Sequence, residues 1–442
     1  MRKVLTINRI IKPFNKKIYI EGDKSLSIRW VLLSSLSRNK SISYNLLKSD
    51  DVMSAISCIK KLGSRVKVKD NKCEIIGSGL NYKIKKNLIL DAGNSGTLGR
   101  LILGLLVNAD KKFKLVGDKS LSKRDFGRVT KPLKKFGASF KLNKNRLPLM
   151  MKGVQKPKPI NFYEKKGSAQ SKTSVIFAAL KSEGTTRIKA KKSRDHTEIL
   201  LKHLKIPINI KKTKNLDYIS IKGVKKINSL KYRIPGDMSS SAFFIALTIL
   251  SKRSQILIKN VNVNPSRIGV INILKKMGGK IKFMNVRKYK GESIADIFAE
   301  SSVNLKGINC PKNLNSTAID EFLLIFLVAA RSKGVSNFKD ISELNQKESK
   351  RLDWGSRILK LMGIKNEITK DSIKIYGNPK LQIKKTIHIK NFLKDHRVFM
   401  MSVIAALTFG GKWKINDPDS IKTSFPSFLK TLKHIEKKSI KN

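Results

Sequence analysis

The sequence predicts a mixed α/β protein built from about six repeated units that are divided between two domains. Three observations support this fold class. The chain has 442 residues, about three times the usual size of a single domain. An apolar-periodic helix that ends in Leu-Lys-Lys-x-Gly, or a close variant, recurs along the chain. A short strand with alternating apolar and polar residues follows each complete copy.

The helix ends recur at a nearly constant interval. They lie 68 to 85 residues apart, at Gly63, Gly137, Lys205, Gly278 and Gly363, and a last helix around Lys433 has no strand after it. Glycine suits this position because the chain must enter a left-handed conformation before it reverses into a strand. Further short strands, such as KCEIIG and DYISIKG, complete a mixed unit of about 70 residues.

The N-terminal segment, residues 3–20, is expected to supply the strand that the last unit lacks. In that case residues 1–20 and 237–442 form one domain, and residues 21–236 form the other. Turn residues mark both expected crossings, because Gly22 follows the first strand-like segment and Pro235 and Gly236 interrupt the chain near residue 237.

The composition argues against a membrane span, a disulfide framework and a metal site. The longest apolar runs, residues 322–330 and 399–409, are shorter than the roughly 20 residues that span a bilayer, and the N-terminus lacks a secretory pattern. Cys58, Cys73 and Cys310 are isolated from one another, and the five histidines are scattered. We therefore expect a cytoplasmic protein with no metal.

The formal charge of +63 raises the hypothesis of a nucleic-acid partner, because lysines that neutralise phosphates gain affinity by releasing counterions. The lysines are nevertheless spread over every candidate helix and strand, without a basic tail or interleaved aromatic residues. A compositional bias of the genome explains this pattern better. The positive field would also concentrate small anionic substrates.

Several short polar segments precede apolar helices and are candidate anion sites. In EGDKSLSIRW, a cap from Ser25 or Ser27 would join Lys24 and Arg29 at the positive end of a helix. In DAGNSGTLGR, small residues around Gly96 let backbone N–H groups approach a phosphate or carboxylate. In GDKSLSKRDF, Arg124 offers a planar fork to the same groups. Each segment taken singly is better explained as an ordinary capped helix or turn.

Further candidates follow in GSAQSKTS, SRDHTE, AIDEF, ELNQKESKRL and KDHRVF. Asp320 and Glu321 lie at the start of a strongly apolar helix, where two carboxylates are either surface groups or a proton-transfer pair. Lys347, Glu348 and Arg351 are spaced so that a solvated charged helix face is the alternative to a functional role.

Together these segments resemble, in order and across nearly the whole chain, the family of 3-phosphoshikimate 1-carboxyvinyltransferases, or EPSP synthases. GDKSLSIR is similar to the family's GDKSISHR, NSGT..R to its GN-[SA]-[GA]-T..R, and PGDMSSSAFF to its PGDPSSAAF, while SRDHTE, IDE, KES.RL and DHR are retained. SAQ-x-K, SRDHTE and N-P-x-R-x-G resemble class II most closely. The resemblance implies two domains of three βαβαββ units each, arranged like an inverted α/β barrel, with the active site in the interdomain cleft.

The resemblance also implies the reaction and the residues that perform it. The enolpyruvyl group of phosphoenolpyruvate would pass to the 5-hydroxyl of shikimate 3-phosphate, without a metal or redox cofactor. Catalytic roles would fall to Asp320, Glu348 and Lys24. Shikimate 3-phosphate would be bound by Lys24, Ser25, Arg29, Ser168, Ala169, Gln170, Ser193, Asp320 and Lys347. Phosphoenolpyruvate would be bound by Lys24, Gly96, Arg124, Gln170, Arg351 and Arg397. Family precedent implies a monomer.

The sequence departs from the family pattern at Ser122, Asp125, Asn345, Lys350 and Thr423. Part of the family has a phosphoenolpyruvate-binding lysine where Thr423 stands, and Lys422 is one residue away. Since the residues expected to perform the chemistry are retained, we expect activity. Gly96 leaves room where a methyl group would crowd the herbicide glyphosate, so we also expect sensitivity to it.

Two alternatives remain at this point. The sister enzyme that transfers enolpyruvate to UDP-N-acetylglucosamine shares the fold, but its mobile loop carries a cysteine, and the loop around Arg124 has none. A basic RNA-binding protein would instead use the charge of +63.

Overall fold

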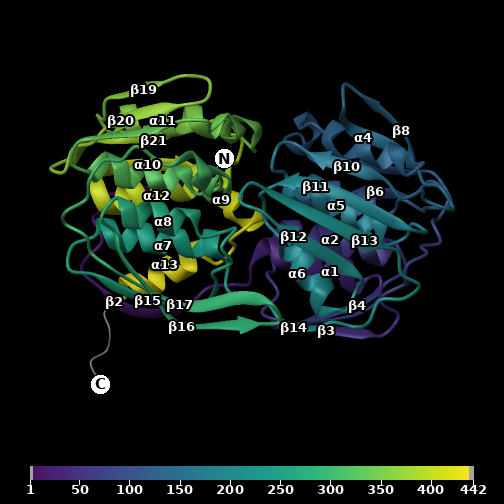
Figure 1. Ribbon diagram of the computed structural model, residues 1–442. Coiled ribbons are helices and arrows are strands. Elements are labelled where there is room, and N and C mark those ends of the chain that lie inside the picture. Colours follow the sequence, from purple (N-terminus) through teal and green to yellow (C-terminus); the bar gives the residue numbers. More distant parts are fainter. Residues whose placement is uncertain (1–2, 438–442) are drawn as a thin grey trace. The chain divides into compact units, whose positions relative to one another are not determined.

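The computed structural model describes residues 3–437 and divides into two compact units (Figure 1). The unit that we call the central unit comprises Gly22–Ile234 and Tyr289–Glu292. The unit that we call the terminal unit comprises Met1–Glu21, Pro235–Lys288 and Ser293–Asn442. Each unit is described by itself below.

The central unit repeats one βαβαββ pattern three times. The first copy contains β14 (Lys231–Arg233), α1 (Lys24–Ser34), β3 (Lys40–Tyr44), α2 (Asp50–Lys61), β4 (Arg65–Lys69) and β5 (Lys72–Ile76). The second contains β6 (Ile89–Asp91), α3 (Gly96–Leu105), β7 (Phe113–Val116), the 3₁₀ turn η1 (Leu121–Lys123), α4 (Gly127–Lys135), β8 (Ser139–Asn143) and β9 (Arg146–Lys152). The third contains β10 (Asn161–Glu164), α5 (Ala169–Ala179), β11 (Thr185–Lys191), α6 (His196–His203), β12 (Ile208–Lys212) and β13 (Leu216–Lys222).

The three sheets of this unit have equivalent strand orders, namely β14-β3-β5-β4, β6-β7-β9-β8 and β10-β11-β13-β12. In each of them the first pair is parallel and the other pairs are antiparallel. A parallel pair needs a crossover helix, whereas the antiparallel hairpin closes with a short turn, so the second and third sheets follow directly from the βαβαββ order. In the first sheet β14 comes from the end of the unit and takes the place of the leading strand.

The terminal unit holds the rest of the elements within the described residues. Its first sheet and helices are β2 (Asn15–Tyr19), α7 (Met238–Leu250), β15 (Gln255–Asn262), α8 (Gly269–Lys276), β16 (Lys280–Tyr289) and β17 (Glu292–Glu300). Next come η2 (Lys312–Leu314), α9 (Asn315–Ala318), α10 (Phe322–Arg331), β18 (Val335–Phe338), η3 (Ser342–Gln346), α11 (Arg351–Leu361), β19 (Asn366–Ile368) and β20 (Ile373–Tyr376). The last are β21 (Ile383–Ile389), α12 (His396–Phe409), β22 (Gly410–Asn416), η4 (Pro418–Thr423), α13 (Phe428–Glu436) and β1 (Val4–Ile7).

The N-terminal segment supplies strands to two sheets of the terminal unit. β1 pairs antiparallel with β22, so it takes the place of the strand that the last copy lacks, as the sequence predicts. β2 pairs in parallel with β15, which the sequence did not predict. Figure 1 shows β15, β16 and β17 side by side in the sheet that contains β2, whose order is β16-β17-β15-β2.

The repeated helix ends take the backbone conformation that the sequence predicts. The φ angles are 92° at Gly63, 108° at Gly137, 93° at Gly278 and 87° at Gly363, and Lys205 takes 57° in the one copy without glycine. Each of these helices can therefore stop and reverse into its strand.

Three almost fully buried helices form the centre of each unit. In the central unit α3 packs against α1 and α5, and in the terminal unit α7, α10 and α12 pack against one another. Their side chains are buried on every face, whereas α2, α4, α8, α11 and α13 bury one face only. Polar residues at the first turns of the central helices are therefore held in a rigid setting.

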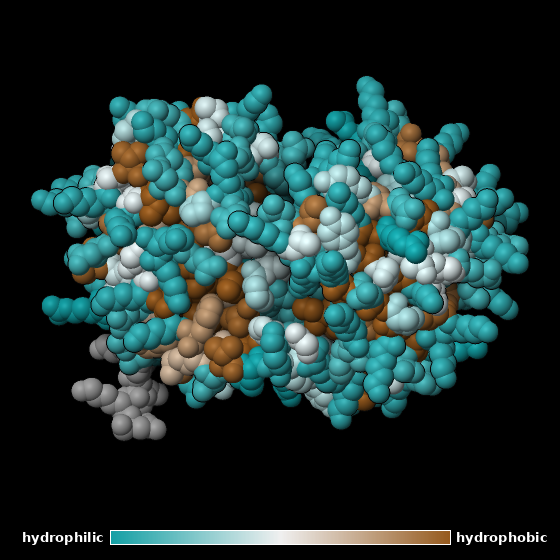
Figure 2. Space-filling view, viewed as in Figure 1, coloured by the Kyte–Doolittle hydropathy of each residue, from teal (hydrophilic) through white to brown (hydrophobic). Residues whose placement is uncertain are grey.

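Hydrophilic side chains predominate on the face of both units that Figure 2 shows. Within residues 3–437, every helix is too short or too polar to cross a membrane.

Candidate active site

The first turn of α1 places the first predicted anion site in the central unit. Asp23 is the N-cap of this helix, since its side chain accepts a hydrogen bond of 2.9 Å from the Leu26 backbone N–H. The expectation of a cap from Ser25 or Ser27 was therefore wrong, because the helix begins at Lys24 and Asp23 is the residue directly before it, whereas both serines lie inside the helix. Lys24 Nζ lies 2.9 Å from Oδ2 of Asp51, a buried carboxylate at the start of α2.

Arg29 lies one turn further along α1 and is buried. Its Nε donates to Thr197 Oγ1 at 2.9 Å, and its Nη1 donates to the Ser25 carbonyl at 3.0 Å. Thr197 Oγ1 in turn lies 2.8 Å from Thr173 Oγ1 on α5. Two hydroxyl groups from separate helices thus fix the direction of this guanidinium.

Helices α3 and α5 meet through their first turns. Ser95 caps α3 and Ser168 caps α5, as their side chains accept backbone N–H groups of Leu98 and Ser171. Gln170 Oε1 accepts from Arg100 Nη1 at 2.6 Å, and Gln170 Nε2 donates to Thr97 Oγ1 at 3.0 Å. Ala169 is the first residue of α5. The positive ends of two buried helices therefore converge around one glutamine, which favours an anion there.

Arg124 follows η1 and approaches the same helix end. Its Nη2 donates to Asn94 Oδ1 at 3.2 Å, and its Nη1 lies 3.0 Å from the position that a Cβ would take at Gly96. The Arg100 Nη1 lies 3.1 Å from that same position. Two guanidinium groups thus flank the start of α3, which suits a carboxylate or a phosphate.

The SRDHTE segment forms the turn before α6. Ser193 is half-buried there, and its hydroxyl oxygen has no hydrogen-bond partner within residues 3–437. Lys172 of SAQSK and Glu198 of SRDHTE form a fully buried ion pair of 2.7 Å. This pair ties α5 to α6 and explains why both segments carry charges that the solvent does not reach.

In the terminal unit the predicted residues gather at the starts of α10, α11 and α12. Asp320 Oδ1 lies 3.2 Å from Lys347 Nζ and 3.6 Å from Arg351 Nη1. Arg397 Nη1 donates to the Asp320 carbonyl at 2.6 Å and lies 3.4 Å from Glu321 Oε1. The Asp320 carboxylate thus lies beside two cationic side chains, and a third, Arg397, contacts its backbone carbonyl.

Arg351 is buried and surrounded by carboxylates. The alternative interpretation, in which this arginine lies on a solvated helix face, is therefore wrong. Its Nε lies 2.9 Å from Asp395 Oδ2, and its Nη2 hydrogen-bonds Glu348. Burial alone would lower the pKa of Arg351, but the charges of Asp395 and Glu348 outweigh that effect and raise it. The guanidinium is therefore permanently charged.

Asp395 caps α12 and accepts from Ser349 Oγ at 2.8 Å as well as from Arg351. Burial alone would raise the pKa of Asp395, but Arg351 outweighs it and holds the pKa below the ordinary 3.8. The carboxylate thus stabilises the fold fully above pH 3.8, and this contribution disappears as the pH falls through the lower pKa of the folded state.

Asp395→Asn is therefore expected to lower the free energy of unfolding at pH 7 by about 3–5 kcal/mol, the usual effect of breaking a buried ion pair. The variant should also lose less stability than the unmodified protein when the pH is lowered below 3.8. Urea titrations at pH 7 and at successive acid pH values measure both effects. Asp340→Asn, in an exposed pair with Lys312, is the matched control, and equal losses in the two variants would contradict the prediction.

Several departures from the family pattern have local structural roles. Asp125 Oδ1 accepts the Gly127 backbone N–H at 2.8 Å where α4 begins. Asn345 Oδ1 accepts the Leu352 N–H at 3.0 Å in the first turn of α11. Ser122 Oγ donates to the Gly117 carbonyl, and Thr423 Oγ1 lies 3.2 Å from His396 Nδ1. Lys350 is the residue before α11.

Sequence reasoning missed the residues that hold the predicted ones in place. These are Asp51 for Lys24, Thr97 and Arg100 for Gln170, Asn94 for Arg124, Thr173 and Thr197 for Arg29, and Asp395 for Arg351. Arg100 was within reach of the sequence, because it ends the DAGNSGTLGR segment. Asp51 had no signal of its own, since only the fold brings α2 to the start of α1.

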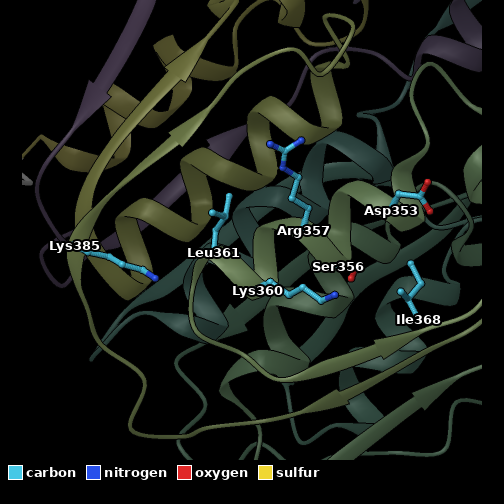
Figure 3. Close-up of a pocket in the computed structure, with 7 residues that line it drawn as sticks. All are labelled: Asp353, Ser356, Arg357, Lys360, Leu361, Ile368 and Lys385. Carbon is cyan, nitrogen blue, oxygen red and sulfur yellow. The ribbon is translucent and has the colours of Figure 1, made fainter.

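A pocket of about 480 Å³ lies elsewhere in the terminal unit. Figure 3 shows its lining, which consists of Asp353, Ser356, Arg357, Lys360, Leu361, Ile368 and Lys385. Its lining includes none of the residues that the sequence predicts for the site. The candidate active site is therefore defined by the converging helix starts and not by this depression on α11.

Comparisons with known proteins agree with these motifs. The profile of the family described as EPSP synthase (3-phosphoshikimate 1-carboxyvinyltransferase) matches residues 8–432. A 3-phosphoshikimate 1-carboxyvinyltransferase of Ruthia magnifica subsp. Calyptogena magnifica is 39% identical over 430 residues, which cover 96% of this chain and 97% of that protein. One from Caldicellulosiruptor bescii is 37% identical over 425 residues, which cover 95% and 96% respectively.

Solved structures give the same result for the fold. An EPSP synthase structure from Acinetobacter baumannii superposes with a TM-score of 0.85 at 32% identity and covers 98% of both chains. The predicted α/β fold class of the enolpyruvyl transferases is thereby confirmed. With a family match across almost the whole sequence, relatives of nearly equal length and the charged helix starts described above, the chain belongs to the EPSP synthase family, the 3-phosphoshikimate 1-carboxyvinyltransferases.

Proposed function

We propose that this chain transfers the enolpyruvyl group of phosphoenolpyruvate to the 5-hydroxyl of shikimate 3-phosphate, yielding 5-O-(1-carboxyvinyl)-3-phosphoshikimate and phosphate. This reaction serves aromatic amino acid biosynthesis through chorismate. The observation that carries the proposal is the Asp320 carboxylate, 3.2 Å from Lys347 Nζ and 3.6 Å from Arg351 Nη1. A carboxylate among fixed cations suits a base that works beside anionic substrates.

The predicted binding residues form two overlapping sets, one for each substrate. Shikimate 3-phosphate is bound by Lys24, Ser25, Arg29, Ser168, Ala169, Gln170, Ser193, Asp320 and Lys347. Phosphoenolpyruvate is bound by Lys24, Gly96, Arg124, Gln170, Arg351 and Arg397. The support is chemical, because two substrates with two phosphates and two carboxylates need several cations, and planar arginine fits their oxygen pairs.

The addition step requires two proton transfers. Asp320 accepts the proton of the 5-hydroxyl as its oxygen attacks C2 of phosphoenolpyruvate. C3 receives a proton from Glu348, assisted by Lys24. The C3 methylene thereby becomes a methyl group, C2 becomes tetrahedral, and the addition intermediate forms. Lys24, Arg124 and Arg397 offset the charge on the phosphate and the carboxylate.

The elimination step reverses the proton movement at C3. The bond between C2 and the phosphate oxygen breaks, and the phosphate leaves with the electron pair and takes up the proton that Asp320 had accepted. C3 gives a proton back to Glu348, and the new vinyl group forms. The products therefore balance the substrates, and the side chains return to their initial protonation states. These steps need no metal or redox partner beyond the residues named.

We further propose that the enzyme is a cytoplasmic monomer, since both substrates are charged metabolites and family precedent favours a single chain. Light scattering on the purified protein tests the monomer, which a stable dimer would contradict.

Phosphate release tests the proposed reaction. Purified protein is given phosphoenolpyruvate and shikimate 3-phosphate together, and each one alone, at low and moderate salt. We expect release only when both are present. Parallel reactions with UDP-N-acetylglucosamine as the acceptor, and a salt-dependent RNA-binding assay, test the two alternative functions. Phosphate release with UDP-N-acetylglucosamine but not with shikimate 3-phosphate as the acceptor would contradict the proposal. RNA binding without any phosphate release would contradict it as well.

Gly96→Ala is expected to raise the KM for phosphoenolpyruvate about tenfold and to weaken glyphosate inhibition further. The added methyl would lie 3.0 Å from Arg124 Nη1 and 3.1 Å from Arg100 Nη1, so both guanidinium groups must move by a few tenths of an ångström. A displacement of that size weakens charge-assisted contacts by about 1–2 kcal/mol. Initial rates with and without glyphosate measure both effects.

The unmodified enzyme should be inhibited by millimolar glyphosate. Gly334→Ala is the matched control, because a Cβ at that glycine would meet nothing within 4 Å, although its φ of 88° costs some stability. Inhibition that is equal in the unmodified enzyme and Gly96→Ala would refute the steric argument.

A further inference from the structure

We infer that Arg267, the arginine of the N-P-x-R-x-G segment, is a positioning residue that sets the direction of Arg397 for the proposed reaction. Arg267 lies in the turn before α8 and is 2% exposed. The proposed reaction does not use it directly. The inference rests on the proposed function, because it assumes that Arg397 binds phosphoenolpyruvate.

The first link runs from Arg267 to α7. Its Nη2 lies 3.2 Å from Asp237 Oδ1 and donates to Ser239 Oγ at 2.7 Å. Asp237 caps α7, as its Oδ1 also accepts the backbone N–H groups of Ser239 and Ser240. The guanidinium is thus attached to the start of a fully buried helix.

The second link runs from α7 to α10. Ser239 Oγ donates to Glu321 Oε1 at 2.5 Å. A hydroxyl has one proton to donate, so with this proton given to Glu321 the serine oxygen must accept from Arg267. The direction of both hydrogen bonds is therefore fixed, and the charges at the two ends of the serine reinforce each other.

The third link reaches the candidate active site. Glu321 precedes α10 directly and its Oε1 lies 3.4 Å from Arg397 Nη1, which also donates to the Asp320 carbonyl at 2.6 Å. The residues of these links are buried, and each is less than one tenth exposed: Asp237, Ser239, Glu321 and Arg397. Four sequence segments thus form one buried chain of alternating charges: PGDMSSS, NPSRIG, IDE and DHR.

The physical consequence follows from the low exposure. Removing the Arg267 charge leaves Asp237 and Glu321 buried with one cation fewer, so their carboxylates turn toward other partners. Glu321 then no longer holds Arg397 in the same direction. Displacing a substrate-positioning group by about 1 Å is enough to lower a rate by about 10²-fold.

The test compares Arg267→Met with Arg331→Met. Glu321 and Arg397 lie at the starts of α10 and α12, and Arg331 joins these two helices at their other ends. It lies in the last turn of α10, and its Nη2 donates to the Thr408 carbonyl of α12 at 2.8 Å. We expect Arg267→Met to raise the KM for phosphoenolpyruvate at least tenfold and to change the KM for shikimate 3-phosphate less than twofold. Arg331→Met should lower the melting temperature and leave both KM values unchanged.

A merely structural role would lower the melting temperature and the active fraction without this split between substrates, and that result would overturn the inference. Arg267→Lys keeps the charge but loses the planar fork, so it should raise the same KM by only two- to fivefold. If Arg267→Met does not fold, an unchanged KM for phosphoenolpyruvate in Arg267→Lys overturns the inference equally. Failure of the proposed function is recognised separately, because the unmodified protein would then release no phosphate.

Discussion

Asp320→Asn is expected to lower kcat by about 10²–10⁴-fold, the usual range for removing a general base. Asparagine keeps the shape of the side chain but cannot accept the proton of the 5-hydroxyl. Because Lys347 and Arg351 lie beside the position, both should still bind anionic substrate groups, and the KM values should change much less than kcat. Steady-state rates over a range of both substrates measure the two quantities.

The control for this prediction is Asp353→Asn. Asp353 lies on α11 two residues after Arg351, is exposed, and accepts from Asn345 Nδ2 at 2.9 Å. The substitution removes one carboxylate from the terminal unit without touching Asp320, and we expect a change in kcat below twofold. If kcat of Asp320→Asn stays within threefold of the unmodified enzyme, Asp320 is not the base.

Lys24→Met is expected to lower kcat/KM by about 10³-fold or more. The proposed role of Lys24 includes contacts to both substrates, and each charge-assisted hydrogen bond contributes about 1.5–3 kcal/mol. The same ammonium assists the proton transfer to C3, so kcat should fall together with the affinity. Lys60→Met, at an exposed lysine in the last turn of α2, removes an equal charge and is the matched control.

The partner of Lys24 allows a sharper form of this experiment. Lys24 Nζ lies 2.9 Å from Asp51, so Lys24→Met leaves a buried carboxylate with one cation fewer and should destabilise the central unit. Adding Asp51→Asn to Lys24→Met should restore much of that stability without restoring activity. Recovery of activity in the double variant would mean that Lys24 acts through folding alone.

Much of the fold could be predicted because it depends on local signals. The helix-end glycines can be recognised from the residues around them in the sequence, and their φ is near 90° at Gly63, Gly278 and Gly363. Their spacing gives the repeat, and the repeat shows that a strand is missing at the end. That β1 fills this place follows from counting strands, not from any property of Val4–Ile7.

The position of β2 could not be predicted in the same way. The paired residues of β2 and β15 are 240 positions apart in the sequence, and neither strand carries a pattern that identifies its partner. β2 and β15 belong to one unit because the chain leaves the terminal unit after Glu21 and returns to it at Pro235. Strand patterns predict that a strand exists but leave its neighbour open.

The candidate site shows the same division. Lys24, Arg124, Asp320 and Arg397 stand in segments that resemble a family, so they could be named from the sequence. Their partners depend on tertiary packing: Asp51 reaches Lys24 only because α2 packs on α1. The cap of α1 was assigned to the wrong residue because Ser25, Ser27 and Asp23 all satisfy the composition rule, and only backbone geometry selects one.

The measurement that tests the central claim most directly is the mass of the product formed in D₂O. The enzyme is given phosphoenolpyruvate and shikimate 3-phosphate in deuterated buffer, and the product is examined by mass spectrometry and NMR. Addition followed by elimination requires C3 to gain a solvent proton and then lose one, so the account predicts deuterium in the vinyl group of the product. A product without deuterium, or no product joining the two substrates, would contradict it.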